Sequence, residues 1–160
     1  GPIGYRTANL AKAFGAKVIG YNRSHSHDDI TYTDLNTLLQ TSDIVSIHLP
    51  LTKDTKHFID KDKLSLMKKD AILINTARGG IIDNEALAEA LKKGEIAGAG
   101  IDVFDMEPPL PEDYPLLSAP HTVLTPHVGF DTEEAMERRA AIVADNLKSF
   151  VEGKQKNIIC

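Results

Sequence analysis

Three residues of this sequence combine a reactive side chain with a position after an apolar run. Arg78 follows the run 71–75, and His127 follows the run 122–124 in the triplet Thr-Pro-His. A guanidinium in such a place can bind a carboxylate through charge-assisted hydrogen bonds, and a histidine suits proton exchange near neutral pH. Glu107 adds a carboxylate in the loop after a further run. The residue types indicate a site for a small anion with an acid–base group, a form of help typically worth about 10²–10⁴-fold in rate.

The chain opens Gly1-Pro2-Ile3-Gly4, which fits part of a phosphate-binding turn. A dinucleotide-binding turn reads G-x-G-x-x-G between a strand and a helix, and Gly1 and Gly4 match its second and third glycines. The backbone of Pro2 and Ile3 would then face a phosphate at a helix N-terminus. Asn22 lies about 20 residues further on, where a ribose-binding side chain is expected. By itself G-x-x-G also marks loose helix starts, so that alternative stays open.

Short apolar runs alternate with helical stretches along the chain. Most of these runs are nearly continuous, which predicts strands buried on both faces of a parallel sheet. The expected strands are Lys17–Tyr21, Ile44–Leu49, Ala71–Asn75, Gly98–Val103 and Thr122–Leu124. Strand–helix–strand alternation predicts a doubly wound, three-layer α/β fold.

Capping residues mark the ends of the expected helices. Thr33, Asp60 and Asp83 are suitable N-caps, and the glycines at 15, 94 and 153 end helical stretches. The expected helices are Arg6–Phe14, Asp34–Gln40, Lys61–Met67, Asn84–Lys93 and about Thr132–Glu152. Met106–Pro120 holds five of the eight prolines and is expected to be a loop.

The turn at Gly1 lacks its first glycine and the strand that should precede it. We therefore expect a Rossmann-type sheet without its first strand, with unpaired edges on the two neighbouring strands. Three or four missing aliphatic side chains would remove roughly 5–10 kcal/mol of burial, comparable to the whole stability of a typical domain. The sequence is interpreted as a fragment whose missing part precedes Gly1.

Composition excludes several classes of protein. The chain has 160 residues, 42% of them hydrophobic and 26% charged, and a formal charge of −5. This predicts a globular domain that binds neither nucleic acid nor membrane. The single cysteine, Cys160, fits a reducing, cytoplasmic location. His25, His27, Asp28 and Asp29 are interpreted as a solvated loop and not as metal ligands, so no metal site is expected.

Four ordered segments resemble the D-isomer-specific 2-hydroxyacid dehydrogenases. The resemblance covers the whole chain in the order of the family's motifs, and the glyoxylate/hydroxypyruvate reductases are the most similar in pattern. The segments are His48-Leu49-Pro50-Leu51-Thr52, Asn75-Thr76-Ala77-Arg78-Gly79-Gly80, Gly100-Ile101-Asp102-Val103-Phe104-Asp105-Met106-Glu107-Pro108 and Leu124-Thr125-Pro126-His127-Val128-Gly129. It implies a nucleotide-binding domain at 1–152 and a tail at 153–160 that leads back to a substrate domain not contained in the sequence.

The resemblance implies hydride transfer between NAD(P)H and C2 of a small 2-keto or 2-hydroxy acid. Arg78 would bind the substrate carboxylate, His127 would exchange the proton, and Glu107 would stabilise the imidazolium. Asp102 would contact the nicotinamide end of the cofactor. The positions expected to line the cofactor groove are Pro50, Thr55, Thr76, Ala77, His127 and Gly129.

The segment Tyr21-Asn22-Arg23-Ser24 bears on the choice of cofactor. NAD-preferring members of the family carry an aspartate here, whereas this chain has no carboxylate to repel a 2′-phosphate. Arg23 can pair with that phosphate, and Asn22 and Ser24 can hydrogen-bond it. One such charge-assisted bond is worth about 1.5–3 kcal/mol, or roughly 10- to 150-fold in preference. The pattern favours NADP(H) over NAD(H), with an exposed Arg23 as the alternative.

The main interpretation is the cofactor domain of a reductase that works as a homodimer in its complete form and is inactive as this fragment. The alternative is a non-enzymatic, NAD(H)-sensing regulatory module of the corepressor type. Retention of Arg78, Glu107 and His127 favours the enzyme. The sequence does not identify which 2-keto acid is used.

Overall fold

The structure is a computed structural model that describes residues 1–22, 27–106 and 109–158. The chain forms two compact units, Gly1–Pro126 and His127–Cys160. The first unit holds all the described strands, and the second holds one long helix and the C-terminal segment.

The strands of the first unit are all parallel and form two separate sheets. The smaller sheet pairs β1 with β2, and the larger has the order β3-β4-β5-β6. The strands are β1 (Ile19–Gly20), β2 (Thr31–Tyr32), β3 (Ile44–Ile47), β4 (Ile72–Asn75), β5 (Gly98–Ile101) and β6 (Thr122–Leu124). The predicted strands are confirmed with shorter bounds, and the described strands divide into two sheets between β1 and β3.

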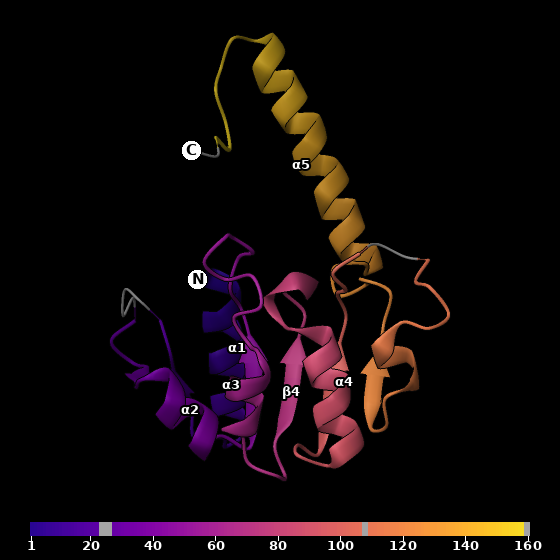
Figure 1. Cartoon of the computed structure of the whole chain (residues 1–160). Coiled ribbons are helices and arrows are strands. Elements are labelled where there is room, and N and C mark those ends of the chain that lie inside the picture. The colour runs from indigo at the N-terminus through magenta and orange to yellow at the C-terminus, as the bar shows by residue number, and fades with distance from the viewer. Residues whose placement is uncertain (23–26, 107–108, 159–160) are drawn as a thin grey trace. The chain divides into compact units, whose positions relative to one another are not determined.

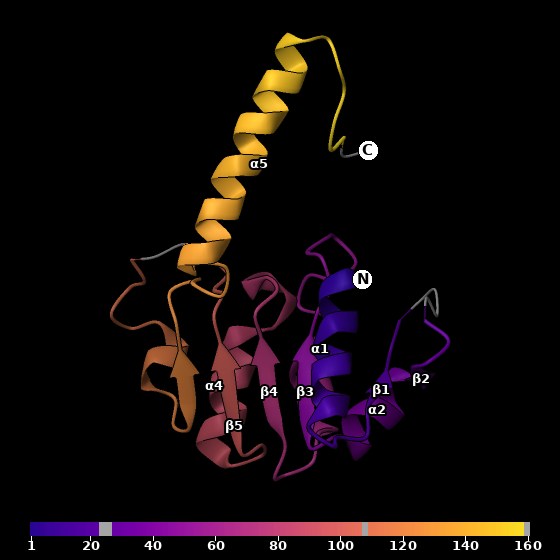
Figure 2. The same ribbon diagram turned by 180° about the vertical axis from the view of Figure 1, so that it is seen from behind.

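Helices flank the larger sheet on both sides, which confirms the α/β fold. Figure 1 shows α3 and α4 in front of the strands, and Figure 2, seen from behind, shows α1 on the opposite side. The helices of this unit are α1 (Pro2–Ala13), α2 (Leu35–Thr41), α3 (Lys61–Ser65) and α4 (Asn84–Lys93), with short 3₁₀ turns η1 (Gly79–Ile81) and η2 (Pro115–Ser118).

The hydrophobic core lies between the larger sheet and the helices α3 and α4. Side chains that point to this side of the strands, such as Val45, Leu73 and Ile101, are buried. They pack with Leu64 of α3 and Leu87 of α4. The period of alternation along each strand sends every second side chain into this core.

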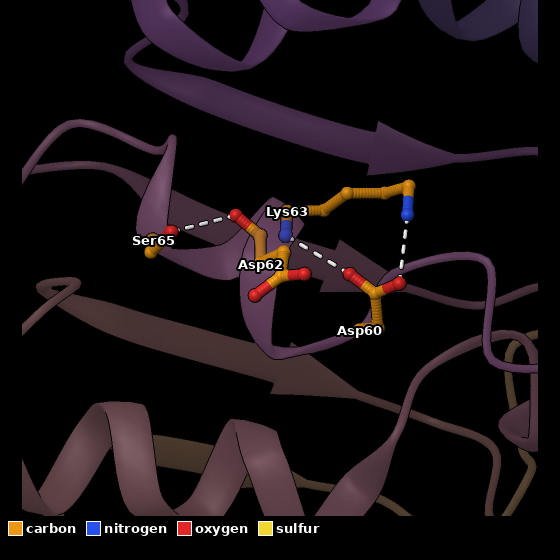
Figure 3. A network of polar contacts seen from close by, with 4 residues as sticks. All are labelled: Asp60, Asp62, Lys63 and Ser65. Atoms are coloured by element: carbon orange, nitrogen blue, oxygen red, sulfur yellow. Dashed lines mark hydrogen bonds and ion pairs between the residues drawn. The ribbon is translucent and has the colours of Figure 1, made fainter.

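Local hydrogen bonds explain where the core helices begin. The Asp83 carboxylate accepts from the Ala86 amide at the start of α4, which ends at Gly94 with φ +64°. Asp60 does the same for α3 by accepting from the Lys63 amide at 3.0 Å, while the Lys63 ammonium donates to its other oxygen at 2.8 Å (Figure 3). This bond to Lys63 lowers the pKa of the Asp60 carboxyl. Asp60 and Asp83 are thus confirmed as caps.

The prediction that the strands are buried on both faces is wrong. On the face away from α3 and α4, Ile44, Ile72 and Val123 are 63%, 40% and 69% exposed. Among the described helices of the first unit, only α1 lies on that side, and α1 has no buried residue.

Three local predictions also need correction. Asp34, and not Thr33, caps α2, because its carboxylate accepts from the Thr37 amide at 2.9 Å. Strand β2 was not predicted. It has only two residues, which pair with β1. The expected loop Met106–Pro120 contains the 3₁₀ turn η2, which buries Leu116 in the core.

The second unit is built on α5 (Glu133–Val151). The Thr132 hydroxyl accepts from the Ala135 amide at its start, and Glu133 and Glu134 lie in its first turn, at the positive end of the helix dipole. Its apolar side chains, including Leu147 and Phe150, are exposed within this structure. The division predicted at residue 152 stays a prediction. No described helix is long and apolar enough to cross a membrane.

Candidate cofactor and substrate site

The candidate site lies at the edge of the larger sheet where its parallel strands end. Figure 2 shows β3, β4 and β5 pointing to the same edge, at which α1 also begins. Ligands of open α/β sheets bind at this edge because the loops that follow the strands meet there. Of the predicted site residues that the structure describes, the loops after β3, β4 and β5 carry Pro50, Thr55, Thr76, Ala77, Arg78 and Asp102.

The loop after β4 carries Arg78 on a turn organised by Asn75. The Asn75 side chain is fully buried, its Oδ1 accepts from the Ala77 amide at 3.0 Å, and its Nδ2 donates to the Arg78 carbonyl at 3.0 Å. The Arg78 side chain is exposed, and its Nη1 donates to the Ala77 carbonyl at 2.6 Å. Thr76 is also exposed at this turn. The guanidinium is therefore accessible to a ligand while its backbone is held in place.

Neighbouring loops approach this turn closely at Gly79 and Gly80. A Cβ atom added at Gly79 would lie 1.9 Å from the Phe104 carbonyl carbon, in the loop after β5. The next residue, Gly80, accepts a hydrogen bond at 2.8 Å from the amide of His57, in the loop after β3. The three loops are thus built against one another around Arg78.

Asp102 directly follows β5 and has a buried carboxylate. The Thr125 hydroxyl, at the end of the neighbouring strand β6, donates to its Oδ1 at 2.5 Å. The Asp102 amide donates to the Asn75 carbonyl at 3.0 Å. Asp102 is 6% exposed, so this bond to Thr125 offsets part of the cost of burying its charge.

The loop after β3 is shaped by Thr55. Its hydroxyl donates to the Pro50 carbonyl at 2.6 Å and accepts from the Thr52 amide at 2.7 Å. Thr55 is buried and Pro50 is exposed. Thr55 therefore contributes to this edge through the shape of the 50–55 loop, and Pro50 presents its surface.

The turn at Gly1–Gly4 has the space and the packing that a phosphate site needs. As a glycine, Gly1 adds no side chain that would keep a ligand away from its backbone. A Cβ at Gly4 would lie 3.1 Å from the His48 Cβ, so this glycine lets α1 pack closely on the end of β3. Pro2 occupies the first turn of α1, which has no side-chain cap bond. Such a helix start attracts anions, and these residues fit a dinucleotide phosphate.

The remaining predicted residues are distributed over other parts of the chain. Asn22 follows β1 and is half-buried, whereas Arg23, Ser24 and Glu107 lie outside the described residues. His127 and Gly129 belong to the second unit. The His127 ring meets Phe130 edge to face at 5.8 Å, and its backbone has φ +58°, an uncommon conformation for a residue with a side chain. The roles predicted for these residues stay predictions.

Comparison with known proteins identifies the architecture. The sequence model described as D-isomer specific 2-hydroxyacid dehydrogenase, NAD binding domain, matches residues 1–129. The chain belongs to this family. The matched region includes the Gly1–Gly4 turn, the Arg78 loop and the segment that ends at Gly129.

Curated members of the 2-hydroxyacid dehydrogenase family are similar over nearly the whole chain. A glyoxylate reductase from Thermofilum pendens is 47% identical over 160 residues, which are 96% of this chain and 47% of that protein. A glycerate dehydrogenase from Methylorubrum extorquens is 43% identical over 99% of this chain and 50% of that protein. The chain therefore spans about half the length of the curated relatives it matches.

Solved structures agree with the family assignment. The NAD-complexed D-isomer specific 2-hydroxyacid dehydrogenase of Lactobacillus delbrueckii ssp. bulgaricus has a TM-score of 0.91 and 38% identity over 100% of this chain and 53% of its own. An acyclic imino acid reductase in complex with NADPH and D-Arg has a TM-score of 0.89 and 38% identity, covering 100% of this chain and 51% of its own. These names support a nicotinamide cofactor and do not support the corepressor alternative.

Sequence reasoning missed three residues that shape this domain. Asn75 and Thr125 belong to the motifs but had no predicted role, and no contact was predicted between His48 and Gly4. A signal for Asn75 was present, since a polar amide ends an otherwise apolar strand pattern. Thr125 and His48 gave no such signal, because their importance depends on contacts with other strands and with α1.

Proposed function

We propose that the complete protein reduces a small 2-keto acid to the D-2-hydroxy acid with a nicotinamide cofactor. The observation that carries this proposal is the exposed guanidinium of Arg78 at the strand-end edge, on a loop held by buried hydrogen bonds. Family membership and the names of the relatives support the same reaction.

The proposed chemistry divides between binding and proton transfer. Arg78 binds the substrate carboxylate and polarises the keto oxygen through its guanidinium. His127 donates a proton to that oxygen as the keto group becomes a hydroxyl, and Glu107 stabilises the imidazolium that precedes this transfer. When bound, the reduced cofactor supplies the hydride that forms the new C–H bond at C2. In the reverse direction His127 takes the proton from the hydroxyl.

The cofactor would lie along the strand-end edge. The Gly1–Gly4 turn would hold its phosphates at the start of α1, and Asp102 would orient its nicotinamide end. We further propose a preference for NADP(H), because the 21–24 segment offers Asn22, Arg23 and Ser24 and no carboxylate. A charged hydrogen bond from Arg23 to a 2′-phosphate would favour NADPH roughly 10- to 150-fold.

A cytoplasmic homodimer completes the proposal. The single cysteine suits a reducing compartment. The exposed side chains of Ile44, Ile72 and Val123 form an apolar area on the larger sheet that an association partner would cover. Sedimentation of the complete protein tests the dimer, and a single monomeric species at micromolar concentration would contradict it.

The decisive experiment measures turnover. The complete protein that contains this chain is assayed with glyoxylate, hydroxypyruvate and pyruvate, each with NADPH and with NADH. We expect reduction of at least one acid, a tenfold or larger advantage for NADPH, and a loss of at least 10²-fold in His127→Ala. The matched control His121→Ala changes a histidine just before β6 and is expected to keep full activity.

The possible outcomes test the cofactor preference and the reduction separately. An advantage for NADH would refute the role of Arg23 and leave the reduction intact. Tight cofactor binding without turnover of any acid would refute the reductase and favour a sensing role.

A further inference from the structure

We propose that Asn75 is a positioning residue that holds Arg78 in the geometry needed to bind the substrate carboxylate. This inference rests on the proposed function of Arg78 as the anion-binding residue. Asn75 itself touches no reacting atom in this proposal, and it acts only through the 75–78 turn.

The described hydrogen bonds of the Asn75 side chain all lie within that turn. It is fully buried at the end of β4, where the preceding core-facing residue of the strand is Leu73. Burying an amide at such a position is costly unless both its ends are hydrogen-bonded. Here Oδ1 accepts from the Ala77 amide and Nδ2 donates to the Arg78 carbonyl, each at 3.0 Å. An apolar residue would suit the core better, so we attribute the presence of an amide here to its hydrogen bonds with the turn.

The two bonds fix the backbone on both sides of the Arg78 Cα atom. The Ala77 amide is held before it, and the Arg78 carbonyl after it accepts from Asn75 Nδ2 and also from the Ile81 amide at 3.3 Å. The backbone of Asn75 is itself anchored, because its carbonyl accepts from the Asp102 amide in the neighbouring strand. Arg78 is therefore tied through one buried side chain to the larger sheet.

This anchoring matters because the Arg78 side chain is long and exposed. Its guanidinium has no described partner other than the Ala77 carbonyl, which belongs to the same turn. The position of the guanidinium thus depends on the position of its backbone. A displacement of about 1 Å in a binding group can cost on the order of 10²-fold in rate.

The test is a double-mutant cycle in the complete protein, with glyoxylate as the variable substrate. Asn75→Asp keeps the size of the side chain and the acceptor for Ala77, but it loses the donor to Arg78. Asn75→Ser is neutral and replaces the amide donor with a shorter hydroxyl, so agreement between the two variants excludes an effect of the new charge. We expect each to lower kcat/KM at least 30-fold, mainly through a higher KM for glyoxylate, with the KM for the cofactor changed less than threefold.

The second half of the cycle repeats both substitutions in Arg78→Ala. If Asn75 acts through Arg78, they lower kcat/KM less than threefold in that background, because there is no guanidinium left to misplace. A reduction of the same size in both backgrounds overturns the proposal. Asn84→Asp is the matched control, since Asn84 is also a buried amide and its side chain has no hydrogen bond within the described chain. It is expected to change kcat/KM less than threefold.

Amide hydrogen exchange separates this proposal from the proposed function. In Asn75→Ala the Ala77 amide loses its acceptor and should exchange at least tenfold faster, whereas in Asn75→Asp it should keep its protection. An unprotected Ala77 amide in the unsubstituted protein would overturn the positioning role, even if the keto acids are reduced. Failure of the unsubstituted protein to reduce any keto acid would overturn the proposed function, together with the catalytic purpose assigned to the turn.

Discussion

Gly79 and Phe104 approach so closely that no side chain fits between them. An added Cβ at Gly79 would lie 1.9 Å from the carbonyl carbon of Phe104 and 2.0 Å from its carbonyl oxygen. These residues belong to the loops after β4 and β5, which are adjacent strands of the larger sheet. The contact joins the loop of Arg78 to the loop that leads to Glu107.

Gly79→Ala should therefore destabilise the protein strongly. Either loop must move to relieve a clash with backbone atoms, and we expect a loss of about 3 kcal/mol or more in the free energy of unfolding. Gly80→Ala is the matched control, because its added Cβ would meet only the end of the Leu51 side chain at 3.3 Å. Urea denaturation compares the two variants, and equal losses would contradict the close approach.

Thr125→Val should lower the free energy of unfolding, because the buried Asp102 carboxylate loses a hydrogen bond. Valine keeps the shape of threonine but removes the hydroxyl that donates to Asp102 Oδ1 at 2.5 Å. Losing a hydrogen bond to a buried charged group costs about 1.5–3 kcal/mol. Thr125→Ser keeps the hydroxyl and should lose about 1 kcal/mol or less. Comparing the free energies of unfolding of the two variants tests this role of the hydroxyl. A Thr125→Ser variant that is no more stable than the Thr125→Val variant would refute it.

The stability of the protein should fall in mildly acidic solution because of His48. Burial lowers the pKa of this imidazole below its usual value of 6.5. Below about pH 6.5 the unfolded chain binds a proton that the folded chain resists, so the contribution of His48 is present above this pH and is lost as the pH falls. His48→Gln should flatten the dependence. Urea midpoints at about pH 7.5 and about pH 5.5 test this, and an unchanged slope in the variant would exclude His48 as the cause.

Tyr114 should make stability fall in alkaline solution. Burial and a hydrogen bond of 2.6 Å to the Asp105 carboxylate raise the pKa of its phenol above the usual value of 10.0. Above about pH 10 the unfolded chain loses a proton that the folded chain keeps, so this contribution is present below pH 10 and declines above it. Tyr114→Phe keeps the ring and removes the titrating group. Thermal unfolding at about pH 8 and about pH 10.5 should show a smaller decline in the variant, and an equal decline would refute the assignment.

The larger sheet and its helices could be predicted because their signals are local. Runs of aliphatic residues indicated β3 to β6, and Asp83 with Gly94 marked both ends of α4. The motifs around Arg78 and His127 were sufficient to indicate the family, since each motif is continuous in the sequence.

The sequence by itself determined the main helices, the strands of the larger sheet, their order and the residue types available for chemistry at the strand ends. Only the tertiary structure decided that the Asn75 side chain hydrogen-bonds the Arg78 turn, that Gly79 must lack a side chain, and that Ile44 lies on an exposed face. The physical reason is that helix caps and strand periodicity depend on neighbouring residues. Close approach, burial and buried hydrogen bonds depend instead on segments that meet only when adjacent strands pair.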